Sequence, residues 1–321
     1  MSTFYSPVII PTLNRFDHLK QCVDSLNQNH NADKTEVFIS VDYPASEKHN
    51  EGHDKICDYL ENTQFNFKKL HVIKQTHNLG VVSGGKRYSN AIFLRDYIME
   101  RFDRWIFTED DNVFSCCFLD FMNEALERFK DDDTVFSVCG YSFYYDFKFK
   151  DNNFFRQRGD FNAWGCAYWR HKFLDIPQAD ASCLRRMVFN PLKVLKTWRV
   201  SNLQVAHLSV LSQKDFFRVG DNFYTLYMID HGMTQIMPSQ SFVRNIGWDG
   251  TGMHCVDFDN DVVARHMNQE IDESSCFNGL KGTGWECFAE NQRAIRKEDP
   301  QRVSFISALK AYLQRLICFW K

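Results

Sequence analysis

The sequence WIFTEDDN at residues 105–112 is the stretch that best defines the fold. Its first half is apolar and aromatic, as in a buried β-strand, and its second half brings together the carboxylates of Glu109, Asp110 and Asp111. In open α/β sheets, ligands bind beyond the carboxyl ends of the strands. The stretch therefore predicts a central strand that delivers acidic side chains to a binding site.

Similar short apolar stretches recur on both sides of this strand, and helical patterns separate them. The expected strands are residues 7–10, 37–41, 70–74, 105–108 and 135–139. Apolar residues at three- and four-residue steps predict helices from Phe16 to Leu26 and from Phe118 to Phe129. Strands alternating with helices are typical of parallel sheets, so we expect an α/β fold with a mostly parallel, Rossmann-like sheet flanked by helices.

The composition indicates a globular protein without affinity for polyanions. Hydrophobic residues make up 44% of the 321 residues and charged residues 25%, which excludes a disordered or fibrous chain. The net charge of -3 provides no field to attract nucleic acid, so we expect no nucleic-acid partner. We find no linker rich in Pro, Gly or Ser, and we therefore expect one continuous domain.

The cysteines and the first residues favour a cytoplasmic protein. The chain has 11 cysteines, and the adjacent Cys116 and Cys117 match neither a zinc framework nor a secreted disulfide scaffold. We therefore expect reduced, largely buried thiols. Residues 1–11 show no signal peptide or signal anchor, and no window is apolar enough to span a membrane.

Three adjacent acids repel one another unless a cation lies among them, and hard oxygen ligands suit Mg²⁺ or Mn²⁺. A simple polar turn is the alternative reading of residues 109–112. The acidic run at residues 131–133 follows a helix rather than a strand, so we interpret it as a solvated loop.

Polar residues also follow the other expected strands. Residues 11–15 (PTLNR) follow the first strand and Asp42 follows the second. Residues 78–80 (NLG) follow the third strand, and residues 84–87 (GGKR) come next, where we expect a helix to start. These segments should meet at the same edge of the sheet as the acids.

Taken together, these motifs resemble those of the inverting GT-A-type glycosyltransferases, chiefly the family-2 enzymes. They are also similar to the N-acetylglucosaminyltransferase that begins complex N-glycan branching, and the resemblance covers roughly residues 5 to 255. It implies that a nucleotide-sugar donor is bound by Thr12, Asn14, Arg15, Asp42, Asn78, Gly80, Lys86, Arg87, Glu109, Asp110 and, beside the donor sugar, Trp164.

The same resemblance implies roles for several further residues. Asp111 would be the direct metal ligand, and His254, in a glycine-bearing loop, would contact the diphosphate or the metal. Asp221 would be the base that deprotonates the acceptor hydroxyl, with Asp249 and Asp215 as rivals.

The implied reaction is a single in-line displacement at the anomeric carbon with inversion, using Mn²⁺ or Mg²⁺ and a nucleotide-sugar, most simply a UDP-sugar. The acceptor would be a glycan or a lipid-linked saccharide. Residues 1–140 would bind the donor and residues 141–300 the acceptor. Two alternatives remain: a sugar-phosphate nucleotidyltransferase, against which the lack of glycine at residues 11–15 counts, and a non-catalytic carbohydrate-binding protein.

The final segment, residues 301–321, predicts an amphipathic helix. Between Phe305 and Trp320 the apolar side chains recur on one helical face, with Lys310 and Gln314 opposite. Such a helix can lie on a membrane surface, pack on the core or contact a second subunit. The expected location is cytoplasmic, with attachment to the inner face of the cell membrane as one outcome.

Overall fold

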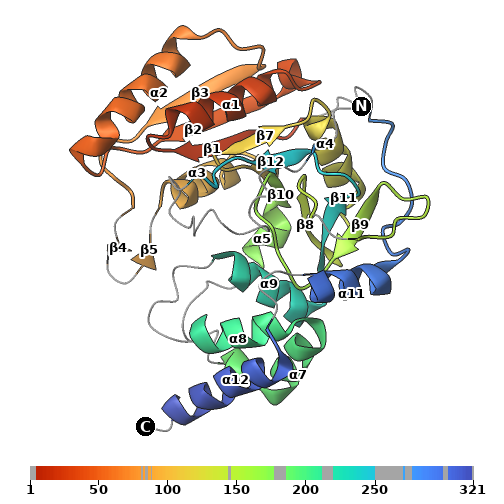
Figure 1. The fold of residues 1–321 in the computed structure, drawn as a ribbon. Helices are drawn as coiled ribbons and strands as arrows, with labels where there is room; N and C mark the ends of the chain where they lie inside the picture. The colour runs from red at the N-terminus through yellow and green to blue at the C-terminus, as the bar shows by residue number, and fades with distance from the viewer. Residues whose placement is uncertain are drawn as a thin grey trace.

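The computed structural model describes residues 5–80, 82–83, 86–87, 89–143, 146–176, 186–211, 220–249, 270–271, 277–298 and 303–319. The chain forms a mixed α/β protein around an eight-stranded sheet (Figure 1). In spatial order the strands are β3 (Lys69–Lys74), β2 (Glu36–Val41), β1 (Val8–Thr12), β6 (Arg104–Phe107), β10 (Cys166–Trp169), β8 (Val135–Cys139), β11 (Thr234–Pro238) and β9 (Phe154–Gln157).

The sheet is mostly parallel, as the sequence predicts. Strands β3, β2, β1 and β6 pair in parallel, as do β8 and β11, whereas β10 and β9 pair antiparallel with their neighbours. All five expected strands are present, with ends that differ by at most two residues. Strands β10, β11 and β9 come from the second half of the chain, so both halves build one sheet.

The helices of the described residues cover both faces of the sheet and form a further layer below it (Figure 1). They are α1 (Phe16–Asn27), α2 (Asn50–Asn62), α3 (Asn90–Met99), α4 (Phe118–Arg128), α5 (Arg170–Leu174), α7 (Pro191–Val200), α8 (Asn202–Leu211), α9 (Gly220–His231), α11 (Phe288–Glu298) and α12 (Phe305–Phe319). Helices α1 and α4 confirm the two helices predicted from apolar spacing.

Alternation along the strands divides the core in two. On β1, Val8 and Ile10 pack into the cluster beneath α1, α2 and α4, whereas Ile9 packs with Leu94 and Ile98 of α3 on the opposite face. Successive side chains of a strand point to opposite faces, so a strand buried on both sides must be apolar throughout. This explains why the predicted strands read as continuous apolar runs.

The expectation of a helix start at residues 84–87 is wrong. Short strands β4 (Val82–Ser83) and β5 (Lys86–Arg87) pair there as an antiparallel hairpin. Helix α3 begins later, at Asn90, where the hydroxyl of Ser89 accepts a hydrogen bond from the Ile92 amide at 3.3 Å. A side-chain cap satisfies an amide that the first turn leaves unpaired, and this fixes the start of the helix.

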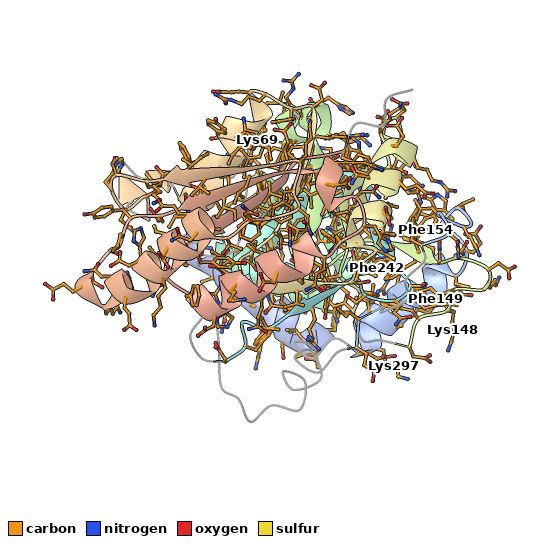
Figure 2. The ribbon with its side chains drawn as sticks, turned by 90° about the horizontal axis from the view of Figure 1, so that it is seen from above. Lys69, Lys148, Phe149, Phe154, Phe242 and Lys297 are labelled. Atoms are coloured by element: carbon orange, nitrogen blue, oxygen red, sulfur yellow. The ribbon has the colours of Figure 1, made fainter. Side chains whose placement is uncertain are left out.

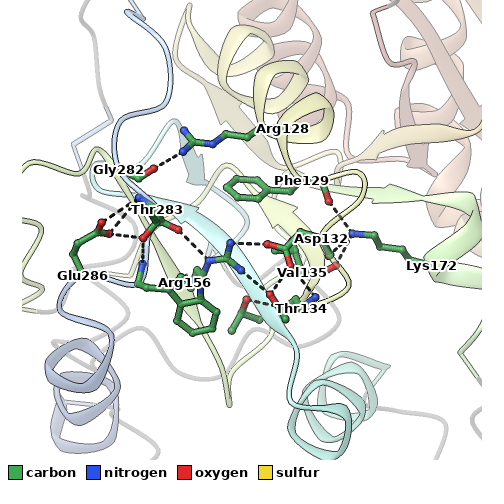
Figure 3. Close-up of polar contacts among 12 residues, drawn as sticks. Arg128, Phe129, Asp132, Thr134, Val135, Arg156, Lys172, Gly282, Thr283 and Glu286 are labelled. Carbon is green, nitrogen blue, oxygen red and sulfur yellow. Dashed lines mark hydrogen bonds and ion pairs between the residues drawn. The ribbon is translucent and has the colours of Figure 1, made fainter.

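Buried polar contacts join the second half of the chain to the sheet (Figure 3). The guanidinium of Arg156 on β9 donates to Asp132 at 2.7 Å, and Lys172 on α5 donates to the backbone carbonyls of Phe129, Asp132 and Val135. The middle acid of the run at residues 131–133 is therefore a structural anchor, which corrects the interpretation of that run as a solvated loop.

The aromatic stretch after residue 140 packs against the sheet and α11. In Figure 2, Phe154 and Phe242 lie among the ribbons, whereas Lys148 and Lys297 lie at the edge of the molecule. The Lys148 backbone amide donates to Asn291 of α11 at 2.8 Å. Phe154 is fully buried, which is consistent with its place in the core.

The predicted C-terminal helix is present as α12, and it lies against α8 in the lower layer (Figure 1). Ala308 is buried there, and the Tyr312 hydroxyl donates to the Val188 carbonyl at 3.0 Å. Leu309 and Leu316 are partly buried, whereas four large apolar side chains of the helix are exposed: Phe305, Ile306, Leu313 and Ile317. Among the described helices, none has the length and apolar character needed to cross a membrane.

Candidate active site

A cleft of about 960 Å³ lies beyond the carboxyl ends of β1 and β2. Its walls come from the segment after β1, from the start of α2, from residues 78–80 and from the start of α3. The predicted site residues that line it are Thr12, Asn14, Arg15, Asp42, Asn78, Gly80, Asp110 and Asp249. The structure thus brings together most of the residues that the sequence assigns to a donor site.

Asp42 is held at the end of β2 by backbone amides. Its Oδ1 atom accepts hydrogen bonds from the amides of Tyr43 and Leu79, both at 2.9 Å. Burial raises the pKa of this carboxyl, although the two amide donors oppose the shift. The Asn78 amide contacts Oδ2 only at 3.5 Å, so this oxygen can accept a further hydrogen bond from a ligand.

Asn90 fixes the spacing between β1 and β2, and sequence reasoning missed it. Its side-chain amide donates to the Thr12 carbonyl at 3.1 Å and to the Ser40 carbonyl at 2.7 Å. The residue is buried and lines the cleft. Nothing in the sequence linked Asn90 to strands 50 and 78 residues away.

Arg15 connects the segment after β1 to the acids after β6. One of its terminal nitrogens forms ion pairs with Asp110 and, at 2.8 Å, with Asp111. Thr12 donates to the other oxygen of Asp110 at 2.7 Å. Burial alone would lower the pKa of Arg15, but the two carboxylates raise it, so the guanidinium stays charged.

Strand β12 (Val243–Asn245) also positions Asp111. It pairs antiparallel with β7 (Asn112–Phe114), which begins directly after this residue. Asn245 donates to Asp111 Oδ1 at 2.8 Å and to the Asn112 side chain at 3.0 Å. A Cβ atom on Gly247 would lie only 2.0 Å from Asp111 Oδ2, so the carboxylate needs a glycine there. Sequence reasoning noted this segment but gave Asn245 no role.

The acids form a strongly negative centre with one internal cation. Burial, together with the charges of Asp111, Asp221 and Asp110, raises the pKa of Glu109 to about 8. Burial also raises the pKa of Asp110, and Arg15 opposes that shift. Because one Arg15 nitrogen is bound by an oxygen of each aspartate, the two carboxylates point to a shared position that suits a hard divalent cation.

Asp221 lies in a second, smaller cavity of about 150 Å³ between α3, α5 and α9. Aromatic side chains form most of its wall: Trp105, Phe107, Tyr168, Phe173 and Tyr224. Asp221 is exposed to solvent at the start of α9, yet the protein around it partly desolvates the carboxyl and raises its pKa to about 6. Ala91 lines both cavities, so they adjoin at the start of α3.

Asp249 lies in the larger cleft rather than beside Asp221. Its Oδ2 atom is 3.1 Å from Nε2 of His18 on α1. The rival candidate for the base is therefore paired with a histidine on the donor side of the site. His18 lines the cleft as well, and the sequence gave no signal for it.

Trp164 has a packing environment. Its ring lies edge-on to Tyr141 at 4.7 Å and to Trp248 at 6.2 Å between centroids. It lines neither of the two cavities among the described residues. Lys86 and Arg87 belong to the β4–β5 hairpin, and His254 and Asp215 lie outside the described residues.

No family model and no curated protein sequence matches the chain. Several solved structures resemble it. TarS of S. aureus (residues 1–349) has a TM-score of 0.38 and 10% identity over 74% of this chain and 59% of its own. A mannosyltransferase of Pyrobaculum calidifontis in complex with GDP-Man and Mn²⁺ has a TM-score of 0.35 and 11% identity over 70% and 73%.

Mouse xyloside xylosyltransferase 1 has a TM-score of 0.38 and 14% identity over 72% of this chain and 83% of its own. For a complex of TarS (residues 1–349) with UDP-GlcNAc, the match covers 41% of this chain and 33% of the TarS chain. All of these similarities have TM-scores of 0.38 or below. The description of the fold and of the site therefore depends on the geometry given above and not on these structures.

Proposed function

We propose that the protein is a glycosyltransferase that moves a sugar from a nucleotide-sugar, most simply a UDP-sugar, to a hydroxyl of a glycan or lipid-linked saccharide. The observation that carries the proposal is the convergence at one sheet edge of Asp42, Arg15 and the pair Asp110–Asp111, next to the cavity of Asp221. Carboxylates and a cation at strand ends suit the base, ribose and diphosphate of a donor.

The donor would lie in the larger cleft. Its volume of about 960 Å³ is at the upper end of the range for small-molecule sites. The Oδ2 atom of Asp42 would accept a hydrogen bond from an N–H group of the base, while Asn14 and Asn78 would contact the nucleoside. Arg15 would turn from the two aspartates toward the diphosphate, where a guanidinium binds phosphate oxygens in pairs.

Asp110 and Asp111 would hold a Mn²⁺ or Mg²⁺ ion at the position that Arg15 now neutralises. A divalent cation there supplies neutralisation of the charge that develops on the departing nucleoside diphosphate. Asn245 and Gly247 would keep Asp111 in place, because the first donates to its carboxylate and the second leaves room for it. His254 remains a proposed contact to the diphosphate or the metal.

Asp221 would remove the proton from the acceptor hydroxyl. With a pKa of about 6 it is ionised at neutral pH and can still take a proton. General-base catalysis of this kind typically contributes about 10²–10⁴ in rate. The aromatic wall of its cavity would contact the apolar face of an acceptor sugar, opposite the departing diphosphate, and attack from that side would invert the anomeric carbon.

The two halves of the chain would then divide the work. Residues 1–140 provide all but one of the residues that line the donor cleft. The smaller cavity is lined by both halves: Trp105 and Phe107 come from the first, and Tyr168, Asp221 and Tyr224 from the second.

The experiment is a panel of nucleotide-sugars incubated with Mn²⁺ and candidate saccharides, with nucleoside diphosphate release and product anomer as readouts. Release of a nucleoside diphosphate that disappears in Asp111→Asn supports the proposal. Pyrophosphate formed from a nucleoside triphosphate and a sugar 1-phosphate would instead establish a nucleotidyltransferase. Saccharide binding without turnover of any donor would establish a carbohydrate-binding protein.

We also propose that α12 attaches the protein to the inner face of the cell membrane. Four of its large apolar side chains are exposed, beside the basic Lys310. Because Ala308 and Tyr312 pack on the rest of the protein, deletion of the helix would damage the fold. The sharper test is Ile306→Glu with Leu313→Glu, against the exposed control Gln314→Glu, in sedimentation with anionic vesicles. Equal vesicle binding by the unsubstituted protein, the double variant and the control would contradict attachment to the membrane.

A further inference from the structure

Three potential metal ligands meet at a place remote from the acids. His30 lies in the turn after α1, and Cys117 and Asp120 lie at the start of α4. The ligand atoms of His30, Cys117 and Asp120 all lie within 4.8 Å of one another. Nδ1 of His30 is 3.2 Å from Asp120 Oδ2 and 3.8 Å from Cys117 Sγ.

These separations match a tetrahedral zinc site. Zinc bonds of about 2.3 Å to sulfur and about 2.0–2.1 Å to nitrogen or oxygen place neighbouring ligands about 3.6 Å apart for sulfur and nitrogen and about 3.3 Å apart for nitrogen and oxygen. The sulfur of Cys116 lies 3.9 Å from that of Cys117, but it is not within 4.8 Å of all three ligand atoms and so stands outside the cluster.

Hydrogen bonds around the cluster hold the ligands in this arrangement. The His30 amide donates to the Cys116 carbonyl at 2.9 Å, and the Leu119 amide donates to Asn29 Oδ1 at 3.1 Å, so the turn after α1 is fastened to the start of α4. Asn31 donates to Asp120 Oδ1, which leaves Oδ2 directed at His30. Such outer contacts orient ligands in metal sites.

A second Cys–His pair, on α2, lacks the arrangement that would let one ion contact all of the ligand atoms. On α2, the sulfur of Cys57 lies 3.9 Å from Nε2 of His53, whereas Asp54 approaches the other ring nitrogen, Nδ1, at 3.4 Å. The two partners of His53 therefore lie at different nitrogen atoms. At His30, both the sulfur and the carboxylate face the same nitrogen.

We propose that His30, Cys117 and Asp120 bind one Zn²⁺ ion, with a water molecule as the fourth ligand. A thiolate and an imidazole favour zinc over the hard ions suited to Asp110 and Asp111. The ion would join the end of α1 to the start of α4 and thereby stabilise β7, which connects Asp111 to Cys116. The proposal does not depend on the transferase activity.

The test is the zinc content of the full-length protein, purified under reducing conditions without chelator, together with the absorption spectrum of the cobalt-substituted protein. We expect one zinc per chain, and a thiolate-to-cobalt charge-transfer band of a tetrahedral site. His30→Gln, at an exposed position that the fold tolerates, and Cys117→Ser should each lose the ion. Asn31→Gly keeps the positive φ of 62° but removes the amide, and should weaken affinity about 10-fold.

The paired variant His53→Gln/Cys57→Ser should retain one zinc, and so should Asp111→Asn, which separates this site from the acids after β6. A chelator should lower the melting temperature of the unsubstituted protein but not that of His30→Gln. Failure of the unsubstituted protein to take up zinc in a titration would overturn the proposal, as would full retention by both His30→Gln and Cys117→Ser.

Discussion

Arg15 binds Asp111 at 2.8 Å with the same nitrogen that pairs with Asp110. The chain therefore carries its own counter-ion at the position proposed for a divalent cation. Two buried carboxylates without that guanidinium would repel each other, so Arg15 stabilises the pair. Under the proposed function, Arg15 would leave this position when a divalent cation binds.

Arg15→Gln should lower the free energy of unfolding by about 3–5 kcal/mol without metal, because it leaves buried acids uncompensated. Mn²⁺ should restore more stability to this variant than to the unsubstituted protein, since the ion no longer competes with an arginine. Urea unfolding with and without Mn²⁺ measures both effects. Equal stabilisation of the two proteins by Mn²⁺ would argue against binding between Asp110 and Asp111.

Asp221→Asn should leave nucleotide binding unchanged and lower kcat by about 10²–10⁴, because the acceptor hydroxyl keeps its proton. Isothermal titration with a nucleoside diphosphate and Mn²⁺ checks binding, and product formation checks turnover. The matched variant is Asp249→Asn, whose partner His18 lies on the donor side. If Asp249→Asn stops turnover and Asp221→Asn does not, Asp249 is the base.

The pH profile gives an independent test of the base. Since Asp221 must be ionised to accept a proton, and its pKa is raised to about 6, kcat/KM should fall about tenfold per pH unit below 6 and level off above it. An Asp221→Glu variant should keep an acidic limb at a shifted position. An unchanged limb in Asp221→Asn would assign the titration to another group.

Glu109→Gln should stabilise the metal-free protein at high pH. The folded-state pKa of Glu109 is raised to about 8, above the unfolded value near 4.5, so the folded state loses stability as pH rises between these values. The gain in melting temperature should therefore be absent near pH 4, grow with pH and level off above pH 8. The exposed Glu290→Gln serves as the control and should show no such growth.

Gly247→Ala should abolish Mn²⁺-dependent donor binding, because the new methyl group would overlap the Asp111 carboxylate. Gly232→Ala is an informative contrast: its methyl group meets no atom within 4 Å, but its φ of 72° strains an alanine. We expect Gly232→Ala to cost stability alone, and Gly247→Ala to cost binding, as measured by thermal shift with nucleotide and Mn²⁺. Normal binding by Gly247→Ala would show that Asp111 can move without loss.

The strands and the first helices were predictable because their apolar period is local. Strand β6 is one example: it ends at Phe107, and only Thr108 separates it from the acids, so both the strand and its chemical end could be found in one short stretch. Arg15 and Asp42 followed from the same rule about strand ends. The pairing of β4 with β5 was missed because glycines in a sequence occur before helices as well as in turns.

The remaining parts of the site depend on pairs that are far apart in sequence. Asn245 reaches Asp111 over 134 residues, and His30 reaches Cys117 over 87. No spacing rule connects such residues, and only the folded sheet brings them together. Trp164 likewise meets Tyr141 and Trp248 only in the folded chain, 23 and 84 residues away in sequence.

The pairing of β7 with β12 also has a consequence during synthesis. The turn that carries Asp111 emerges from the ribosome early, but its partner strand follows some 130 residues later. A nascent chain can therefore build the nucleotide-facing edge of its sheet while the acidic centre is still unfinished. The pairing that holds Asp111 is completed only after residues 243–245 have been made, and a product terminated before them would lack it.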